Sequence, residues 1–258
     1  MNPLIQSYGK WLLLLVAIAI IAEVVWNWKN ECKVYEKKET VANLSILVGH
    51  VIFKVLLTGY QLFILQWISQ WQFFSLPKNA LVFGATFILV DFVYYWYHRW
   101  SHEVPFLWGF HLVHHSTQQI NFSSAYRLHW LNGLFTPFFF ASLALIGIPI
   151  DWIVLSISLN LLYQFFLHTE MVGKLGPLEG VLDTPSAHRV HHAKNPQYLD
   201  KNFGGVFMIW DRIFGTYIKE TEAPIYGITE GKVGYNPLKI MAFGFTKLIN
   251  KTKQQKTI

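Results

Sequence analysis

Histidine is the residue type whose number and spacing in this sequence point to chemistry. Ten of the eleven histidines lie between His98 and His192, a window of 95 residues in which an even distribution along the 258-residue chain would place about four. Eight of them form three short motifs: HxxxH at His98 and His102, HxxHH at His111, His114 and His115, and HxxHH again at His188, His191 and His192. Residues three or four apart share one face of a helix, so each motif can present several imidazoles in one direction.

Imidazole nitrogen atoms bind zinc, copper, iron and nickel in proteins. At four or five ligands for each ion, eight to ten histidines are enough for two metal ions and too many for one. A structural zinc site is complete with four ligands and often includes cysteine, whereas this chain has a single cysteine, Cys32. The histidines therefore predict a dimetal centre, and iron that binds O₂ and oxidises a lipid suits such a centre better than structural zinc.

Two single histidines and several carboxylates lie near the motifs in the sequence. His129 and His168 flank apolar stretches on the same side as the motifs, and we expect them to be additional ligands. A ligating histidine usually donates its second N–H group to a carboxylate or a carbonyl, which orients the ring. The acidic candidates for that role are Asp91, Glu103, Glu170, Asp183 and Asp200. His50 lies outside the window, and we expect it to be a packed polar residue that binds no metal.

The composition indicates that the motifs belong to a membrane protein. Charged residues make up 14% of the chain, against about 25% in soluble proteins, and the mean hydropathy is +0.30. Five helices are predicted from apolar stretches at residues 11–28, 44–67, 80–97, 131–150 and 152–167. The first is long enough to span a bilayer, and since no convincing cleavage site follows it, we interpret it as a retained anchor and not as a signal peptide. The last two, joined by a tight turn, are short enough for a tilted hairpin that does not fully cross.

The distribution of Lys and Arg residues orients the predicted bundle. Residues 29–40 hold four lysines, whereas Lys10 and Lys78 stand alone on the opposite side. Positive charge favours the cytoplasmic side of a membrane protein, which places residues 29–40 in the cytoplasm. Residues 98–130 and the chain after residue 168 then share that side, so the histidine motifs face the cytoplasm. The net charge of +6 is interpreted as attraction to the membrane surface, and we expect no nucleic-acid partner.

At the three motifs the chain resembles the fatty acid hydroxylase / sterol desaturase superfamily of integral-membrane di-iron enzymes, whose pattern is HxxxH, HxxHH and HxxHH. The resemblance covers roughly residues 80–220. The stretch DFVYYWYHRWSHEVPFLWGFHLVHHS (91–116) is similar to the first two boxes of that family, and residues 161–217 are most similar to its alkylglycerol monooxygenase branch.

The resemblance implies a metal-ligating role for all eight motif histidines: His98, His102, His111, His114, His115, His188, His191 and His192. His129 matches an extra histidine of bacterial-type members, and His168 matches the histidine of an "HTE" segment in the branch. Glu103 matches an acidic residue that supports the site, and Asp91 is a further candidate for such support. The implied cofactor is a pair of iron ions.

The implied reaction is the O₂-dependent hydroxylation or desaturation of a lipid, with a sterol, a fatty acyl chain or an ether lipid as the substrate. The electrons must come from an external donor, because the sequence has no GxGxxG fingerprint and no cysteine cluster. A b-type cytochrome, a ferredoxin and a reduced pterin are all candidates for this donor.

The expected fold is all-α: a multi-pass transmembrane helix bundle with a cytoplasmic helical cap that holds the histidine-ligated dimetal centre. Residues 1–79 are predicted to be N-terminal transmembrane anchor helices, residues 80–220 a fatty acid hydroxylase-like catalytic domain, and residues 221–258 a basic C-terminal tail. Within the tail, residues 236–253 predict either an interfacial amphipathic helix or a plain surface helix.

Two other functional classes remain open at this point. A zinc-dependent membrane hydrolase would be expected to carry HExxH, whereas Glu103 follows the second histidine of the first motif and does not lie between the two. A non-catalytic metal-binding or transport protein would be expected to place its ligands along a path at the middle of the membrane. A transmembrane haem protein is less favoured, because its axial histidines would lie within the helices and not crowd at their ends.

Overall fold

The computed structural model describes the backbone of residues 3–255 and the side chains of residues 10–246 and 248. Within this part of the chain every regular element is a helix, which confirms the prediction of an all-α fold. Residues 1–2 and 256–258, at the outer ends of the predicted anchor region 1–79 and of the predicted tail 221–258, lie outside the described residues.

The described chain forms α-helices joined by loops and by short 3₁₀ turns. Their bounds are α1 (Pro3–Asn30), α2 (Lys37–Ser69), α3 (Ala80–Glu103), α4 (Pro105–His115), α5 (Thr136–Ile146), α6 (Ile150–Phe165), α7 (Pro185–His191), α8 (Ile209–Ile213) and α9 (Pro237–Gln255).

Helices α1, α2 and α3 are long and apolar enough to cross a bilayer. The second and third extend beyond their predicted stretches. Helix α2 begins at Lys37, where the Glu36 side chain caps the helix by accepting a hydrogen bond from the Glu39 backbone N–H (2.7 Å). Helix α3 continues to Glu103, because polar residues can extend a helix past the apolar stretch that hydropathy marks. The first histidine motif therefore lies in the last turns of α3.

Helices α5 and α6 form the predicted hairpin, but α5 is shorter than the stretch 131–150. It begins at Thr136 with Pro137 in its first turn, a position that suits proline. At its other end Gly147 has a φ of 94°, and a Cβ atom there would lie 1.8 Å from the Phe74 carbonyl oxygen, so this turn requires glycine. Helix α5 has 11 residues and is about 16 Å long, which is too short for a hydrocarbon core of about 30 Å.

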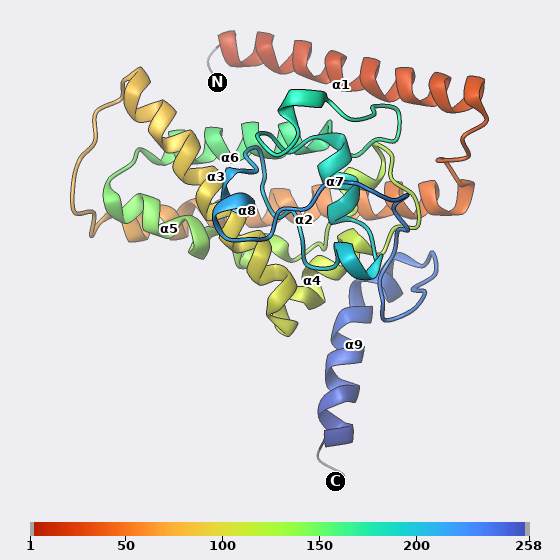
Figure 1. Ribbon diagram of the computed structural model, residues 1–258. Coiled ribbons are helices and arrows are strands. Elements are labelled where there is room, and N and C mark those ends of the chain that lie inside the picture. The colour runs from red at the N-terminus through yellow and green to blue at the C-terminus, as the bar shows by residue number, and fades with distance from the viewer. Residues whose placement is uncertain (1–2, 256–258) are drawn as a thin grey trace.

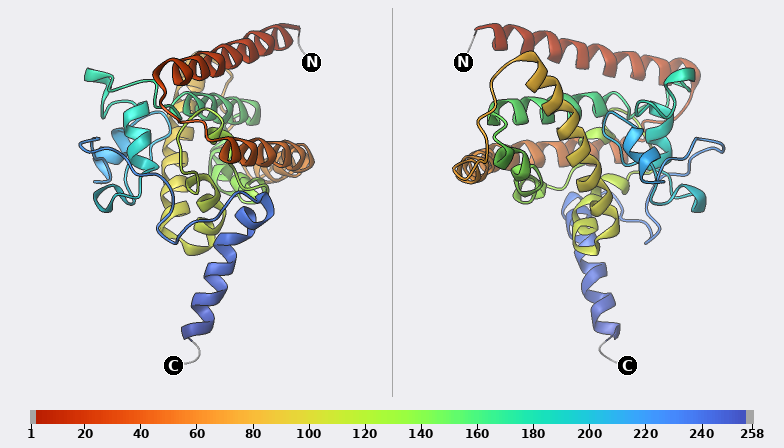
Figure 2. Two further views of the ribbon diagram at one scale, coloured as in Figure 1. Left: turned by 90° about the vertical axis from the view of Figure 1, so that its right-hand side faces the viewer. Right: turned by 60° about the vertical axis from the view of Figure 1, so that its left-hand side comes forward.

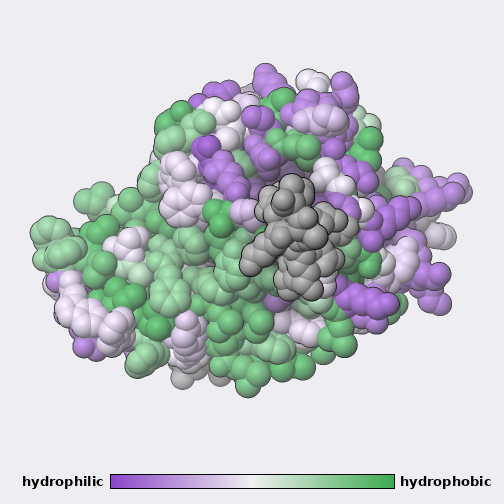
Figure 3. Space-filling model, turned by 90° about the horizontal axis from the view of Figure 1, so that it is seen from below, coloured by the Kyte–Doolittle hydropathy of each residue, from purple (hydrophilic) through white to green (hydrophobic). Residues whose placement is uncertain are grey.

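The short helices and the long loops gather on one side of the long helices (Figures 1 and 2). Helices α1 and α2 run back and forth across the molecule, and α3 crosses them at a steep angle. Helices α7 and α8 and their loops lie together on one face, and α9 projects from the body. Seen from below, hydrophobic residues cover the left and lower parts of the surface, and hydrophilic residues gather at the top and right (Figure 3). This division is the one expected of a membrane-embedded part with a polar cap.

Two clusters of buried apolar residues hold the helices together. One lies between α3 and the α5–α6 hairpin and contains Val90, Phe140, Leu143, Ala144, Ile148 and Ile153. The other joins α2, α4 and α9 and contains Ala42, Ile46, Val113, Ile240 and Met241. The helix predicted within residues 236–253 is thus present as α9. Its interfacial or surface character stays a prediction, because most side chains beyond Thr246 lie outside the described residues.

A buried arginine fixes the end of α4 that carries the second histidine motif. Arg127 Nη1 donates to Glu39 Oε1 (3.1 Å) and to Asn43 Oδ1 (2.9 Å) on α2. Its Nε donates to the Val113 carbonyl (3.1 Å) and to Ser116 Oγ (3.0 Å) at the end of α4. Because this charge is fully buried and fully paired, it ties α2 to α4 without leaving an uncompensated ion.

Candidate metal centre

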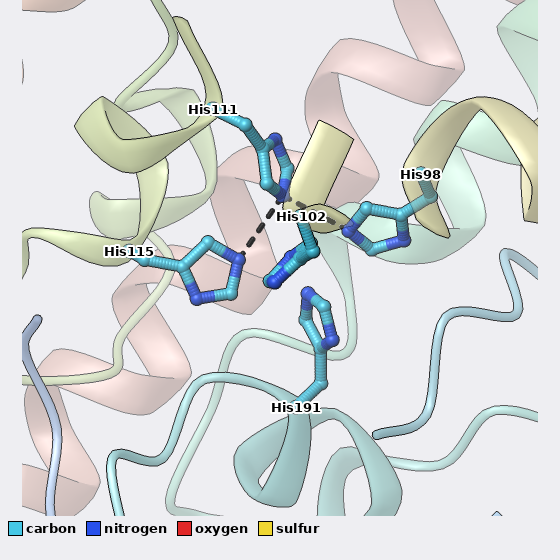
Figure 4. Close-up of side chains that lie close together, drawn as sticks. All are labelled: His98, His102, His111, His115 and His191. Carbon is cyan, nitrogen blue, oxygen red and sulfur yellow. Dashed lines mark hydrogen bonds between the residues drawn. The ribbon is translucent and has the colours of Figure 1, made fainter. Parts of the chain in front are cut away.

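The structure brings nine of the ten predicted ligand histidines together in two groups. Within each group the candidate ligand atoms lie within 4.8 Å of one another. The five-histidine group consists of His98, His102, His111, His115 and His191, and the four-histidine group of His114, His168, His188 and His192. Figure 4 shows the five-histidine group, in which the rings converge from α3, α4 and α7.

Helical geometry divides each HxxHH motif between the two groups. Residues four apart on a helix differ in direction by about 40°, whereas successive residues differ by about 100°. His111 and His115 therefore point into the same group, and His114 points into the other. In the third motif His188 and His192 share the four-histidine group, and His191 reaches the five-histidine group. Each HxxHH motif thus supplies both groups, whereas the HxxxH motif supplies the five-histidine group alone.

The short connection between α3 and α4 and the N-cap of α7 orient the histidine motifs toward one another. A single residue, Val104, separates α3 from α4, and Pro105 starts α4 in the position that suits proline. The two helices therefore turn back on each other, and the ring centroids of His98 and His111 lie 4.8 Å apart. Helix α7 begins at Pro185, where the Thr184 hydroxyl accepts a hydrogen bond from the Ala187 backbone N–H (3.1 Å).

Backbone carbonyls orient two rings of the five-histidine group. His98 Nδ1 donates to the Phe203 carbonyl oxygen (2.9 Å), and His191 Nδ1 donates to the Lys201 carbonyl oxygen (3.0 Å). A carbonyl only accepts, so in each neutral ring the proton is on Nδ1 and the Nε2 atom carries a lone pair. His191 Nε2 and His102 Nε2 are buried with no hydrogen-bond partner among the described residues. Such buried bare nitrogens are costly unless a cation binds between them.

The four-histidine group has the same character. His168 Nδ1 donates to the Gln164 carbonyl (2.8 Å), which leaves the His168 Nε2 lone pair facing His188 Nε2 at 3.1 Å and His114 Nε2 at 3.2 Å. Burial, followed by the neighbouring imidazoles, lowers the pKa of His188 and His192 well below the usual value. Burial lowers the pKa of His168 to about 4. Neutral rings with converging lone pairs are the form in which histidine binds a metal ion.

The two groups adjoin each other. The ring centroids of His115 and His192, one from each group, lie 4.5 Å apart in a stacked arrangement. His114 and His192 within the four-histidine group are equally close, at 4.5 Å. The residues present therefore fit two metal ions held side by side by imidazole alone.

Of the five predicted carboxylates, Asp183 makes a close hydrogen bond to a candidate ligand histidine, and the other four do not. Asp183 Oδ2 lies 3.0 Å from His188 Nδ1 and is fully buried, which is the contact expected of a residue that orients a metal ligand. Asp200 Oδ1 is 3.5 Å from His102 Nδ1, a long contact from an exposed side chain. Glu170 accepts a hydrogen bond from the Tyr226 hydroxyl.

Asp91 and Glu103, which we expected to support the site, have other partners. The Asp91 carboxylate binds the loop that precedes α8, through the backbone N–H groups of Val206 (2.7 Å) and Phe207 (3.2 Å). Glu103 forms an ion pair with Arg99 (2.7 Å) at the exposed end of α3. Among the described residues no hydrogen bond joins either carboxylate to a histidine of the two groups, so support of the site by Asp91 or Glu103 stays a prediction.

Sequence reasoning missed Asp211 as an indirect support of His98. The Asp211 carboxylate accepts hydrogen bonds from the backbone N–H groups of Phe203 and Gly204, each at 2.7 Å. These bonds fix the peptide whose carbonyl oxygen orients His98. Burial raises the pKa of Asp211 to about 6. The one available signal was an acidic residue in the segment IWDRIFG, in which Arg212 is the other charged residue.

The structure does not bring His129 to either group. Its ring lies against Phe110, with centroids 4.7 Å apart, and its Nδ1 accepts a hydrogen bond from the Leu131 backbone N–H (3.1 Å). Burial lowers the pKa of His129 to about 4. We therefore leave His129 out of the proposed ligand set. His50 also lies outside both groups, half-buried in α2, as its position in the sequence predicted.

Comparison with known proteins places the chain in a family. The sequence model of the family described as "Fatty acid hydroxylase" matches residues 83–216, which include all nine histidines of the two groups. The chain belongs to the fatty acid hydroxylase family. No solved structure matches it.

The similar proteins are named as lipid-modifying oxygenases. The alkylglycerol monooxygenase of Homo sapiens is 43% identical over 182 residues, which cover 70% of this chain and 38% of that protein. The alkylglycerol monooxygenase of Xenopus tropicalis is 36% identical over 237 residues, 86% of this chain and 50% of that protein. The ornithine lipid hydroxylase OlsE of Rhizobium tropici is 29% identical over 184 residues, 70% of this chain and 54% of that protein. The aligned region thus spans half or less of the two alkylglycerol monooxygenases.

In this member of the fatty acid hydroxylase family, Asp183→Ala is expected to weaken metal binding at the four-histidine group by about 10- to 100-fold. His188 would lose the acceptor that orients its ring. Asp183→Asn keeps an acceptor oxygen and is expected to retain most of the affinity. Competition with a chelator, at metal concentrations that load one group at a time, measures both variants. Equal affinity in Asp183→Ala and the unchanged protein would rule out this role.

Proposed function

We propose that the chain is a membrane-bound di-iron oxygenase that hydroxylates or desaturates a lipid with O₂ and an external electron donor. The observation that carries this proposal is the convergence of nine imidazoles, with their Nε2 lone pairs facing one another, in two adjoining buried groups. The names of the relatives, which are monooxygenases and hydroxylases of lipids, support the same class of oxidoreductase.

Each of the two histidine groups would bind one of the two ions. His98, His102, His111, His115 and His191 would hold one iron ion, and His114, His168, His188 and His192 the other. Bound iron supplies the activation of O₂ and the removal of hydrogen from an unactivated C–H bond. The chain's own contribution is to keep the Nδ1 protons of His98, His168 and His191 on backbone carbonyls, so that each Nε2 atom stays available.

A small pocket, with room for about one water molecule, lies beside the five-histidine group. It lies between α3, α4 and the segment before α5 and is lined by Tyr97, Ser101, Leu107, Phe110, His111, Asn132 and Phe135. Its aromatic wall continues to the surface, because the exposed Phe106 ring contacts Phe110 and Phe135 at centroid distances of 5.4 and 5.5 Å. We propose that the alkyl chain of the lipid approaches the group along this aromatic wall.

The excess of lysine at residues 29–40 supports a cytoplasmic position for the metal centre. A cytoplasmic centre is open to the electron donors of that compartment, and a b-type cytochrome, a ferredoxin and a reduced pterin all fit. The basic charge of the chain favours an acidic protein among them.

A zinc hydrolase fits the geometry less well. Catalytic zinc sites have three protein ligands, an open position for water and a nearby general base. Here the groups offer four and five imidazoles, and Glu103 is turned to the exposed end of α3 and paired with Arg99. A metal transporter would spread its ligands along a path, whereas these ligands form two compact groups.

Oxygen consumption by the purified full chain tests the proposed function. We expect that the protein, loaded with ferrous iron and supplied with a chemical reductant, takes up O₂ faster when a lipid extract is added. With ¹⁸O₂, a hydroxylated product should contain one ¹⁸O atom, and a desaturated product none. His188→Ala serves as the inactive control. The proposal would be refuted if the lipid extract did not raise the rate of O₂ uptake above that of His188→Ala. The release of hydrolysis products without O₂ uptake would refute it as well.

A further inference from the structure

Helix α1 carries one fully buried charge on an otherwise exposed apolar surface. Between Lys10 and Lys29, Glu23 is the single charged residue in the sequence. Its side chain is 0% exposed, whereas Leu13 and Trp28 on the same helix are 72% and 76% exposed. Burying a carboxylate costs free energy unless its oxygens accept hydrogen bonds. The hydrogen-bond partners of Glu23 therefore indicate the role of this residue.

The partners of Glu23 come from three separate segments. The Tyr35 hydroxyl, in the loop after α1, donates to Oε2 at 2.5 Å, and the Phe122 backbone N–H, in the loop after α4, donates to the same atom at 2.8 Å. The Thr169 hydroxyl, after α6, donates to Oε1. Phe122 and Thr169 are themselves buried. One carboxylate thus connects three segments that are distant in the sequence.

These contacts lead directly to the four-histidine group. Thr169 follows His168, one of its candidate ligands. The Thr169 carbonyl accepts a hydrogen bond from Arg189 Nη1 (3.1 Å), and Arg189 follows His188, a second ligand. Phe122 stacks on Phe165, with centroids 4.9 Å apart, in the last turn of α6 before His168. The Glu23 contacts therefore fix the turn that holds His168 and, through it, the start of the connection to α7.

We propose that Glu23 is a positioning residue of the metal centre: through Thr169 it holds His168 in place, which makes α1 a part of the four-histidine site in addition to an apolar membrane helix. The inference rests on the proposed function in treating the four-histidine group as a metal site. It predicts an effect confined to that group. Four members of the five-histidine group lie on α3 and α4, and the ring of the fifth, His191 on α7, is oriented by the Lys201 carbonyl.

Titration of the anaerobic full chain with ferrous iron, followed by Mössbauer spectroscopy, tests this role. Glu23→Ala is expected to weaken binding of one of two ions about tenfold, by analogy with other losses behind a metal ligand. Glu23→Gln keeps an oxygen acceptor for the Thr169 hydroxyl and should restore part of the affinity. Val24→Ala, at an exposed neighbour on α1, should bind both ions as the unchanged chain does. Thr169→Val removes the same hydrogen bond from the other side and replaces Glu23→Ala if that variant does not fold.

Double variants locate the effect. Adding Glu23→Ala to His188→Ala should leave the remaining ion bound with unchanged affinity, whereas adding it to His111→Ala should weaken the remaining ion. The inference is overturned if Glu23→Ala and Thr169→Val bind both ions as tightly as Val24→Ala with the same spectrum, or if Glu23→Ala loosens the ion that remains in His188→Ala. An unchanged chain that binds no iron would contradict the proposed function, and the inference with it.

Discussion

His191→Ala is expected to abolish lipid oxidation and to lower the metal content of the chain. The His191 ring lies among the other members of its group, with centroids 4.3 Å from His98 and 4.6 Å from His115, and its Nε2 atom is buried without a partner. Alanine removes a ligand at this point of convergence. Because the loss of a residue that only supports a ligand costs about 10- to 100-fold, we expect a fall in activity above that range. Metal analysis and O₂ uptake on the same preparation measure both effects.

Two histidines outside the groups are the matched controls for this experiment. His50→Ala, in α2, and His129→Ala, against Phe110, remove an imidazole without removing a member of either group. Both variants should keep the full metal content. A His191→Ala protein with unchanged metal and activity, or a His129→Ala protein that loses an ion, would contradict the ligand assignment.

Asp91→Ala is expected to destabilise the fold strongly. The Asp91 carboxylate is fully buried between α3, α6 and the loop before α8. It accepts four hydrogen bonds, from Asn160 Nδ2 (2.7 Å), Trp210 Nε1 (2.9 Å) and two backbone N–H groups. Alanine would leave two buried donors (Asn160 Nδ2 and the Val206 N–H) and two part-buried donors without an acceptor. At about 1–3 kcal/mol for each buried donor and less for the others, we expect a loss of about 3 kcal/mol or more.

Thermal unfolding in detergent compares Asp91→Ala with Asp151→Ala. Asp151 pairs with Lys78 at 2.7 Å, but both side chains are more than half exposed, and such pairs contribute about 0–1 kcal/mol. The Asp151 variant should therefore unfold near the temperature of the unchanged protein, well above the Asp91 variant. Equal unfolding temperatures for the two variants would show that the Asp91 contacts do not stabilise the fold.

The grouping of nine histidines could be predicted from the sequence, because the spacing within each motif is a property of a single helix. Within one helix, residues four apart point in one direction, so the pairs His98–His102 and His111–His115 each had to meet a common partner. The division of each HxxHH motif between the two histidine groups follows from the same geometry. His129 shows the limit of this reasoning: its place beside apolar stretches resembled that of His168, but its ring packs against Phe110 and Phe245 and lies in neither group.

The contacts that hold the ligands could not be predicted, because they join distant segments and often use the backbone. Glu23 reaches Phe122 and Thr169, 99 and 146 positions away in the sequence. The acceptors for His98 and His191 are carbonyl oxygens, which every residue carries and no motif marks. Asp91 lies close to the first motif in the sequence, yet it points to the loop before α8. Asp183 does reach His188, because it immediately precedes the N-cap of α7 and His188 lies in the first turn of that helix.

Metal analysis of the full chain, expressed and purified without oxygen, tests the central claim most directly. We expect two iron ions per chain, one of which is lost in His191→Ala and the other in His188→Ala, and O₂ uptake that requires both lipid and reductant. Zinc in the two groups with no O₂ uptake after iron loading, or a single ion whose loss is the same in both variants, would contradict it.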